Sequence, residues 1–378
     1  MIQAVALLSV FGLGIAFSIL GALKLELVKS LNIDDSQFGK LISVLMFTSI
    51  FVVLTFGPIV DMFGYKPVAI TGFLLGFVAV FMLISAKSYG AAVFSCILLG
   101  IGAMCMNLGN TLIPMVLFDG QNAPAALNLG NVFFGLGAFL TPFLIAMLLS
   151  RMGYKTTGRI LATIIIIPVI FAIIATYPAL DKTGDTIAGA IGSAFGLLAN
   201  PVVIVSGLAL FCYIGLEVSM GGWLSTYASS IGFSDKAANI VLSGFWVSLM
   251  IARLITSQMV TPENGVLVIG ALSAVAAVAI GLMVVSKSKV AAAVCVMLTG
   301  LAFGPIFPTI VGVTFAKTAE TVHGSAFGII FALGLLGATT IPAAIGYYSK
   351  GMTIQKSLKI AMAAACILFI IAIIMGQV

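Results

Sequence analysis

Apolar residues run in long, nearly unbroken stretches along this chain of 378 residues. Short clusters of Gly, Pro, Asn, Asp and Lys separate the stretches. Because about 20 apolar residues in a helix cross the hydrocarbon core of a bilayer, each stretch predicts a membrane-spanning helix. We predict about twelve spans, at 3–28, 37–60, 67–86, 90–114, 122–148, 158–178, 200–228, 237–258, 265–286, 289–315, 323–348 and 355–376.

The chain also repeats itself at a spacing of 200 residues without a gap. Two halves with the same number of spans predict parallel repeats, related by an axis along the membrane normal. We therefore expect an all-α membrane protein of two pseudo-symmetric six-helix bundles, at 1–178 and 200–378, joined by a linker at 179–199. The repeated residues are Gly21, Asp35, Leu98, Gly100, Ala126, Gly137, Ala138 and Pro142, which recur as Gly221, Asp235, Leu298, Gly300, Ala326, Gly337, Ala338 and Pro342.

The composition agrees with a surface that faces lipid. Hydrophobic residues make up 62% of the chain and charged residues 7%, whereas a soluble domain carries about 25% charged residues. A net charge of +6 is spread too thinly to indicate a nucleic-acid partner, and we expect none. The five cysteines lie within apolar runs and show no metal-ligand spacing, and there is a single His. We therefore expect no metal, no cofactor and no enzyme activity.

The second predicted span ends in the sequence GPIVDMFGYKP, residues 57–67. This segment resembles the signature loop of the major facilitator superfamily in Gly57, Asp61, Gly64 and Lys66, although Met62 stands where that family usually has a basic residue. The resemblance implies the superfamily fold and a cytoplasmic latch formed by this loop. We assign Arg253, near the end of span eight, to the same cytoplasmic gate. The mirrored loop has Thr261 at the position equivalent to Asp61, so a second latch is degenerate or uses a different pairing.

Three further patches resemble the fucose–, glucose– and galactose–proton symporter branch of that superfamily. They are NLGNVFFGLGA from Asn128, YIGLEVSMGGW from Tyr213 and FGPIFPT from Phe303. The resemblance implies transport of a sugar with a coupled cation, by alternating access at a central site. Members closest to the fucose carrier have acidic residues in spans one and four, and this chain has none deep in those spans.

Glu217 is the candidate for cation coupling. It lies about eleven residues from the end of span seven, so about 16 Å deep in the membrane. A carboxylate there is costly, and such residues usually face a cavity and have a function. Glu217 can exchange a proton, help to hold Na⁺ or accept sugar hydroxyls. The alternative is a structural carboxyl that hydrogen-bonds another helix.

Paired asparagines and aromatic rings supply the predicted substrate contacts. Asn107 and Asn110 in span four, and Asn128 and Asn131 in span five, each lie on one helical face. An amide both donates and accepts, as a sugar hydroxyl does, but the same amides can instead join helices. Aromatic rings suit the apolar faces of sugars, and we select Tyr213, Trp246, Phe303 and Phe307.

We therefore predict a monomeric secondary transporter that moves a sugar or similar small polar solute across the membrane. We expect H⁺ or Na⁺ as the coupling ion and membrane lipid around the protein. The alternatives are an exporter of drugs, metabolites or lipids on the same fold, and a non-transporting membrane sensor. The resemblance implies a bacterial-type cytoplasmic membrane with both termini cytoplasmic. That orientation puts four basic residues inside and thirteen outside, whereas the positive-inside rule predicts the reverse.

Overall fold

The computed structural model of the chain describes residues 1–179, 196–349 and 351–378. The side chains of a few residues within its helices, among them those at 56–58, 61 and 62, lie outside that description. Helices form nearly all of the described structure, and no strand occurs in it. Eleven of the described helices are long and apolar enough to cross a membrane, and Ile240–Thr256 is a shorter apolar helix. The prediction of an all-α membrane protein with about twelve spans is therefore confirmed.

The helices cluster into two compact units, which we call the first unit and the second unit. The first unit comprises Met1–Gly120, Gly130–Ala194 and Thr321–Gly328, and the second comprises Gln121–Leu129, Phe195–Glu320 and Ile329–Val378. Most of the predicted linker at 179–199 lies outside the described residues.

In the first unit, α4 packs against α5, and α5 also packs against α3 and α1. Gly153, at φ 76°, kinks the long helix α7. The part of α7 before the kink carries the span Ala123–Leu149, and its last part forms the span Arg151–Ile174 together with α8. The elements up to the linker are α1 (Ile2–Ala22), α2 (Lys24–Leu31), α3 (Asp35–Phe63), α4 (Tyr65–Ser85), α5 (Tyr89–Met106), α6 (Gly109–Val116), η1 (Phe118–Gly120), α7 (Ala123–Ile166) and α8 (Val169–Ile174).

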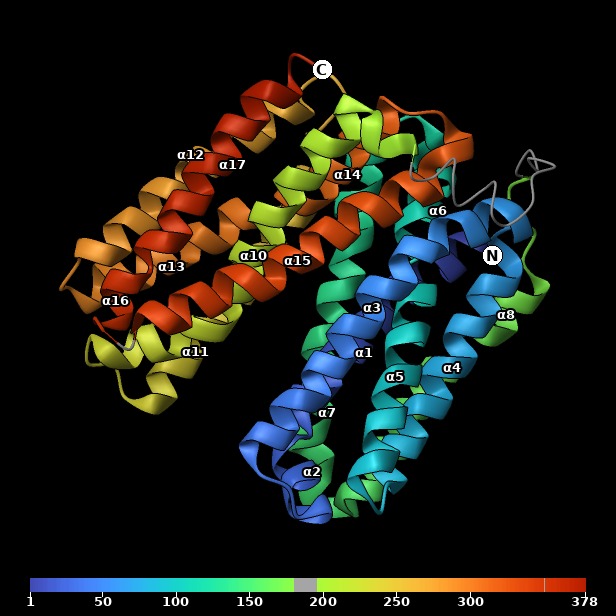
Figure 1. The fold of residues 1–378 in the computed structure, drawn as a ribbon, viewed down its shortest axis with the longest axis horizontal. Helices are drawn as coiled ribbons and strands as arrows, with labels where there is room; N and C mark the ends of the chain where they lie inside the picture. The colour runs from blue at the N-terminus through green and yellow to red at the C-terminus, as the bar shows by residue number, and fades with distance from the viewer. Residues whose placement is uncertain (180–195, 350) are drawn as a thin grey trace. The chain divides into compact units, whose positions relative to one another are not determined.

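In the second unit, α12 lies side by side with α13 and α17 (Figure 1). The helix α11 packs against α13 and α10. The elements after the linker are η2 (Leu197–Ala199), α10 (Pro201–Ser230), α11 (Asp235–Thr256), α12 (Gly265–Val285), α13 (Lys289–Phe303), α14 (Ile306–Ala316), η3 (Glu320–Val322), α15 (His323–Ser349), α16 (Ile354–Ser357) and α17 (Lys359–Met375).

The 200-residue repeat of the sequence is also a repeat of helix boundaries. The helices α4 and α12 begin and end 200 residues apart, and α5 and α13 begin 200 residues apart. Even the N-caps recur, since Ser88 Oγ accepts from Ala91 N and Ser288 Oγ accepts from Ala291 N. Each cap satisfies a backbone N–H that the first helical turn leaves without a partner.

Two equivalent spans, one in each unit, are broken near their middle at related positions of the 200-residue repeat. In the first unit, α5 ends at Met106 and α6 begins at Gly109. In the second unit, α13 ends at Phe303 and α14 begins at Ile306, with Gly304 and Pro305 between them. We call this second interruption the span-ten break. Proline explains it, because proline has no N–H and its ring clashes with the preceding turn.

Candidate functional site

The span-ten break leaves a backbone carbonyl that its own helix cannot satisfy. The usual donor for the carbonyl of Gly304 is the N–H four residues later, and that residue is Pro308. The side chain of Arg253, on α11, takes over this role, because its Nε donates to the Gly304 carbonyl oxygen at 2.8 Å. A buried carbonyl without a donor is costly, so this bond stabilises the break.

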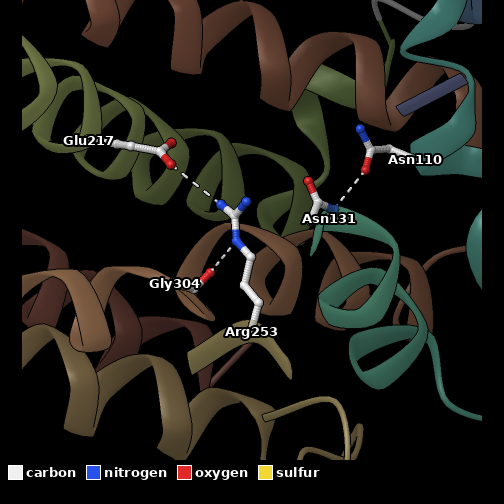
Figure 2. A network of polar contacts seen from close by, with 5 residues as sticks. All are labelled: Asn110, Asn131, Glu217, Arg253 and Gly304. Carbon is white, nitrogen blue, oxygen red and sulfur yellow. Dashed lines mark hydrogen bonds and ion pairs between the residues drawn. The ribbon is translucent and has the colours of Figure 1, made fainter. Parts of the chain in front are cut away.

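The same guanidinium pairs with Glu217 on α10. Arg253 Nη2 lies 3.4 Å from Glu217 Oε1, and the two side chains are 2% and 16% exposed. Figure 2 shows the Arg253 guanidinium between the Glu217 carboxylate and the Gly304 carbonyl. The structure thus brings together Glu217, predicted for coupling, and Arg253, predicted for the gate. Removal of Glu217 would take a nearby counter-charge away from the buried guanidinium, which is destabilising.

Aromatic rings pack around the same break. Tyr213, one helical turn before Glu217, lies with its ring centroid 5.9 Å from that of Phe303 and 6.3 Å from that of Phe307. Phe303 is the last residue of α13 and Phe307 the second of α14, so Tyr213 contacts both sides of the break. Three of the four predicted aromatic residues therefore form one cluster, and all three are buried.

Two phenylalanines that the sequence analysis did not select complete this aromatic cluster. The Phe245 ring lies 6.1 Å from that of Phe303, and the Phe331 ring lies 6.1 Å from that of Phe307. Nothing local in the sequence distinguishes them from the other phenylalanines of the chain. The fourth predicted aromatic residue is Trp246, whose ring centroid lies 5.1 Å from that of Phe245. The Trp246 side chain is 37% exposed, so it lies at the margin of the cluster.

Three of the four predicted asparagines form a buried chain of amides in the first unit. Asn110 Nδ2 donates to Asn107 Oδ1 at 2.8 Å, and Asn131 Nδ2 donates to Asn110 Oδ1 at 2.9 Å (Figure 2). These amide hydrogen bonds join the break between α5 and α6 to the helix α7. Asn107 Nδ2 is buried and has no hydrogen-bond partner among the described residues.

Asn128 belongs to the second unit and has different partners. Its Nδ2 donates to the Pro124 carbonyl at 2.8 Å and to Thr309 Oγ1 at 3.1 Å. Thr309 lies on α14, just after the span-ten break. Asn128 Oδ1 is buried without a hydrogen-bond partner in the described part of the chain. The four asparagines thus divide into a set of three and a single residue in the other unit.

The predicted latch residues lie along the last turns of α3, in the turn after it and on the first turn of α4. Gly64 has φ 81°, a left-handed conformation that glycine adopts without strain, and it makes the tight turn between the two helices. Lys66 is exposed on the first turn of α4. Gly57 and Asp61 lie on α3, and the surroundings of both residues are outside what the structure describes. The role of this loop as a latch stays a prediction.

The mirrored loop of the second unit is closed by its own side chains. Asn264 Oδ1 accepts from Thr261 N at 2.8 Å, and Thr261 Oγ1 accepts from Asn264 N at 3.3 Å. Hydrogen bonding from Thr261 lowers the pKa of the exposed Glu263 carboxyl. Since Arg253 is engaged with Glu217 and Gly304, Thr261 and Asn264 close this loop without it.

Comparison with known proteins gives one family and several distant relatives. The sequence pattern of the Major Facilitator Superfamily matches residues 6–342. Protein TsgA of Shigella dysenteriae is 29% identical over 189 residues, which cover 48% of this chain and 45% of TsgA. Bypass of stop codon protein 6 of Saccharomyces cerevisiae is 27% identical over 172 residues, which cover 43% of this chain and 35% of the yeast protein. The chain thus spans less than half the length of these curated relatives.

A solved structure resembles the chain over its whole length. The crystal structure of the transporter FucP in the outward conformation has a TM-score of 0.83, covers 100% of this chain and 99% of FucP, and is 20% identical in sequence. A second structure of the same protein is described as that of the Escherichia coli fucose:proton symporter. At this level of identity the likeness establishes the fold.

Proposed function

Since this chain belongs to the Major Facilitator Superfamily, we propose that it is a secondary transporter that moves a sugar or a similar small polar solute by alternating access, in symport with protons. The observation that carries the proposal is the buried ion pair of Glu217 and Arg253 beside a broken span. Ionisable residues within membrane helices are rare and usually belong to ion or substrate pathways.

The choice of a sugar rests on the buried amides. Asn107 Nδ2 is a free donor and Asn128 Oδ1 a free acceptor among the described residues. A sugar hydroxyl both donates and accepts, so it can satisfy either group. The likeness to the fucose:proton symporter supports the same substrate class.

The choice of protons over Na⁺ rests on the partner of Glu217. A Na⁺ site requires several oxygen ligands around the ion, and an adjacent guanidinium repels a cation. A proton instead neutralises the carboxylate and needs no further ligand. Glu217 with Arg253 at 3.4 Å is thus arranged for proton exchange rather than for holding a metal cation.

Uptake of labelled hexoses into proteoliposomes tests the proposal directly. We expect accumulation of at least one hexose when the outside is acidic, and no added effect of a Na⁺ gradient. A prior thermal-shift screen of monosaccharides, polyols and organic anions selects the substrate. Stabilisation by organic anions alone would contradict the sugar assignment, and outward transport of apolar compounds would favour an exporter.

Glu217→Gln removes the titrating carboxyl while it keeps the side-chain shape. We expect it to abolish proton-driven accumulation but to retain exchange of labelled for unlabelled substrate across the membrane, because exchange needs no net proton movement. The matched control is Glu263→Gln, in an exposed loop, which should leave both activities unchanged. Normal proton-driven accumulation by a folded Glu217→Gln protein would refute the assignment.

The protein is a multi-pass integral membrane protein. We place it as a monomer in a bacterial-type cytoplasmic membrane with both termini in the cytoplasm. The bacterial relative TsgA and the superfamily's latch loop at 57–67 support this placement.

A further inference from the structure

Contacts from two helices converge on the span-ten break. Tyr213, on α10, contacts the aromatic residue on each side of the break. Arg253, on α11, donates to the Gly304 carbonyl inside it. Glu217 lies one turn after Tyr213 and pairs with that same Arg253. One guanidinium, that of Arg253, therefore contacts both the span-ten break and the Glu217 carboxylate.

The bonds from Arg253 to Gly304 and to Glu217 depend on different conditions. The bond from Nε to the Gly304 carbonyl exists because Pro308 offers that carbonyl no backbone donor. The contact from Nη2 to Glu217 is attractive only while the carboxyl is ionised. Among the described residues, the phenol of Tyr213 also faces the pair, and an ordinary phenol carries no charge near pH 7. The helix α14 has no charged residue, and α13 has only Lys289 at its start.

We propose that Arg253 is a positioning residue that transmits the charge of Glu217 to the span-ten break. The proposal rests on the proposed function in one respect, namely that Glu217 takes up the coupled proton. Protonation of Glu217 removes the counter-charge that this carboxylate supplies to the buried guanidinium, which is unfavourable. Arg253 then moves towards another acceptor or water, and its Nε leaves the Gly304 carbonyl. The break, having lost the Arg253 donor to that carbonyl, loosens.

Backbone hydrogen exchange of the purified protein, without substrate, tests the proposal. The measured quantity is the protection of the amides at Gly304, Ile306 and Phe307. We expect Glu217→Gln, which imitates the protonated state, to lower this protection about tenfold at neutral pH, the change expected for loss of one hydrogen bond to a charged group. Amides at the other break, residues 107–109, serve as the internal reference and should not change.

Variants of Arg253 separate transmission from simple support of the fold. Arg253→Lys keeps the positive charge, but its single nitrogen cannot take the places of both Nε and Nη2, so protection at the break should fall about tenfold as well. Addition of Glu217→Gln to Arg253→Lys should then cause no further loss. In the wild type, protection should fall as the pH is lowered, and in Arg253→Lys and Arg253→Gln it should not depend on pH.

Pro308→Ala gives the Gly304 carbonyl a backbone donor of its own. We expect this variant to raise protection at the break and to make it insensitive to Glu217→Gln. The matched control is Pro142→Ala, since Pro142 also lies inside a membrane helix, α7, in the other unit. With Pro142→Ala, the break should still respond to Glu217→Gln as in the wild type.

Two results with Arg253 variants would overturn the proposal, and a third concerns Glu217→Gln alone. One is equal protection of the break in the wild type and in folded Arg253→Lys at every pH. The other is an equal response to Glu217→Gln with and without Arg253. Since no substrate is present, failure to find a transported sugar leaves this test unaffected. Conversely, a Glu217→Gln protein that loses accumulation but keeps normal protection would refute this inference and leave the proposed function standing.

Discussion

Asn110 stands at the centre of the buried amide chain of the first unit. It donates to Asn107 and accepts from Asn131, so a single side chain joins the broken span to α7. Hydrogen bonds of this kind hold membrane helices together, and the same amides can also meet a substrate hydroxyl. Stability and transport measurements on the same variants distinguish these two uses.

We expect Asn110→Ala to destabilise the protein by about 1–3 kcal/mol, because Asn107 and Asn131 each lose a buried partner. In a double-mutant cycle with Asn131→Ala, the coupling energy should be about 0.6–1.7 kcal/mol, as for other hydrogen bonds between membrane helices. Unfolding in detergent measures it, and exposed Gln377→Ala is the control. Additive effects would show that the two amides do not interact. A raised KM without lost stability would assign Asn110 to substrate binding.

Glu217 and Arg253 can be identified one by one from the sequence, but their pairing cannot. Glu217 and Arg253 each stand out as charges inside apolar spans, so the sequence identifies both as candidates. They are 36 positions apart, on different helices, and no local pattern pairs them. The pairing depends on how α10, α11 and the span-ten break pack, and that is a tertiary property.

At the scale of helices, glycine allows one contact to recur in both units. A Cβ on Gly137 would meet the carbonyl oxygen of Phe11, and a Cβ on Gly337 would meet that of Phe211. Gly137 and Gly337 occupy equivalent positions of the 200-residue repeat, and so do Phe11 and Phe211. The pairs α1 with α7 and α10 with α15 therefore approach through the same small-residue contact, which is typical of membrane helices.

Gly137→Ala and Gly337→Ala should each destabilise the protein by about 1–3 kcal/mol. A backbone carbonyl cannot turn aside as a side chain can, so the helices must separate. The control is Gly222→Ala, in the membrane helix α10, where a Cβ meets nothing within 4 Å. That change should be neutral or stabilise by up to about 1 kcal/mol, because alanine favours helix. Thermal unfolding measures all three, and equal melting temperatures would refute the close-contact argument.

At the scale of the whole molecule, basic residues lie mostly in connections on one side of the membrane. Lys24 and Lys29 follow the first span, Lys87 follows the third and Lys155 follows the fifth. The same side recurs in the second half, where Lys287 follows α12. The orientation that we propose makes this side extracytoplasmic, against the usual charge bias.

Cysteine labelling with a membrane-impermeant reagent in intact cells tests the orientation. We expect Lys155→Cys to be labelled and Glu263→Cys to be protected, since an odd number of spans separates these exposed positions. Lysis should make Glu263→Cys accessible, which controls for its reactivity. The opposite pattern would place both termini outside the cell. The basic residues would then lie on the cytoplasmic side, as the positive-inside rule predicts.

The amino-acid sequence by itself determined the membrane class, the helical fold, the approximate spans and the 200-residue repeat. These properties depend on hydrophobicity over about 20 residues and on spacing along the chain, both of which are local. The sequence also marked Glu217, Arg253 and the asparagines, because polar groups in lipid are conspicuous. Only the tertiary structure decided their partners. It joined Arg253 to Glu217 and Gly304, placed Asn128 apart from the other asparagines, and added Phe245 and Phe331 to the aromatic cluster. These contacts link distant positions, and each depends on packing between helices that no single helix specifies.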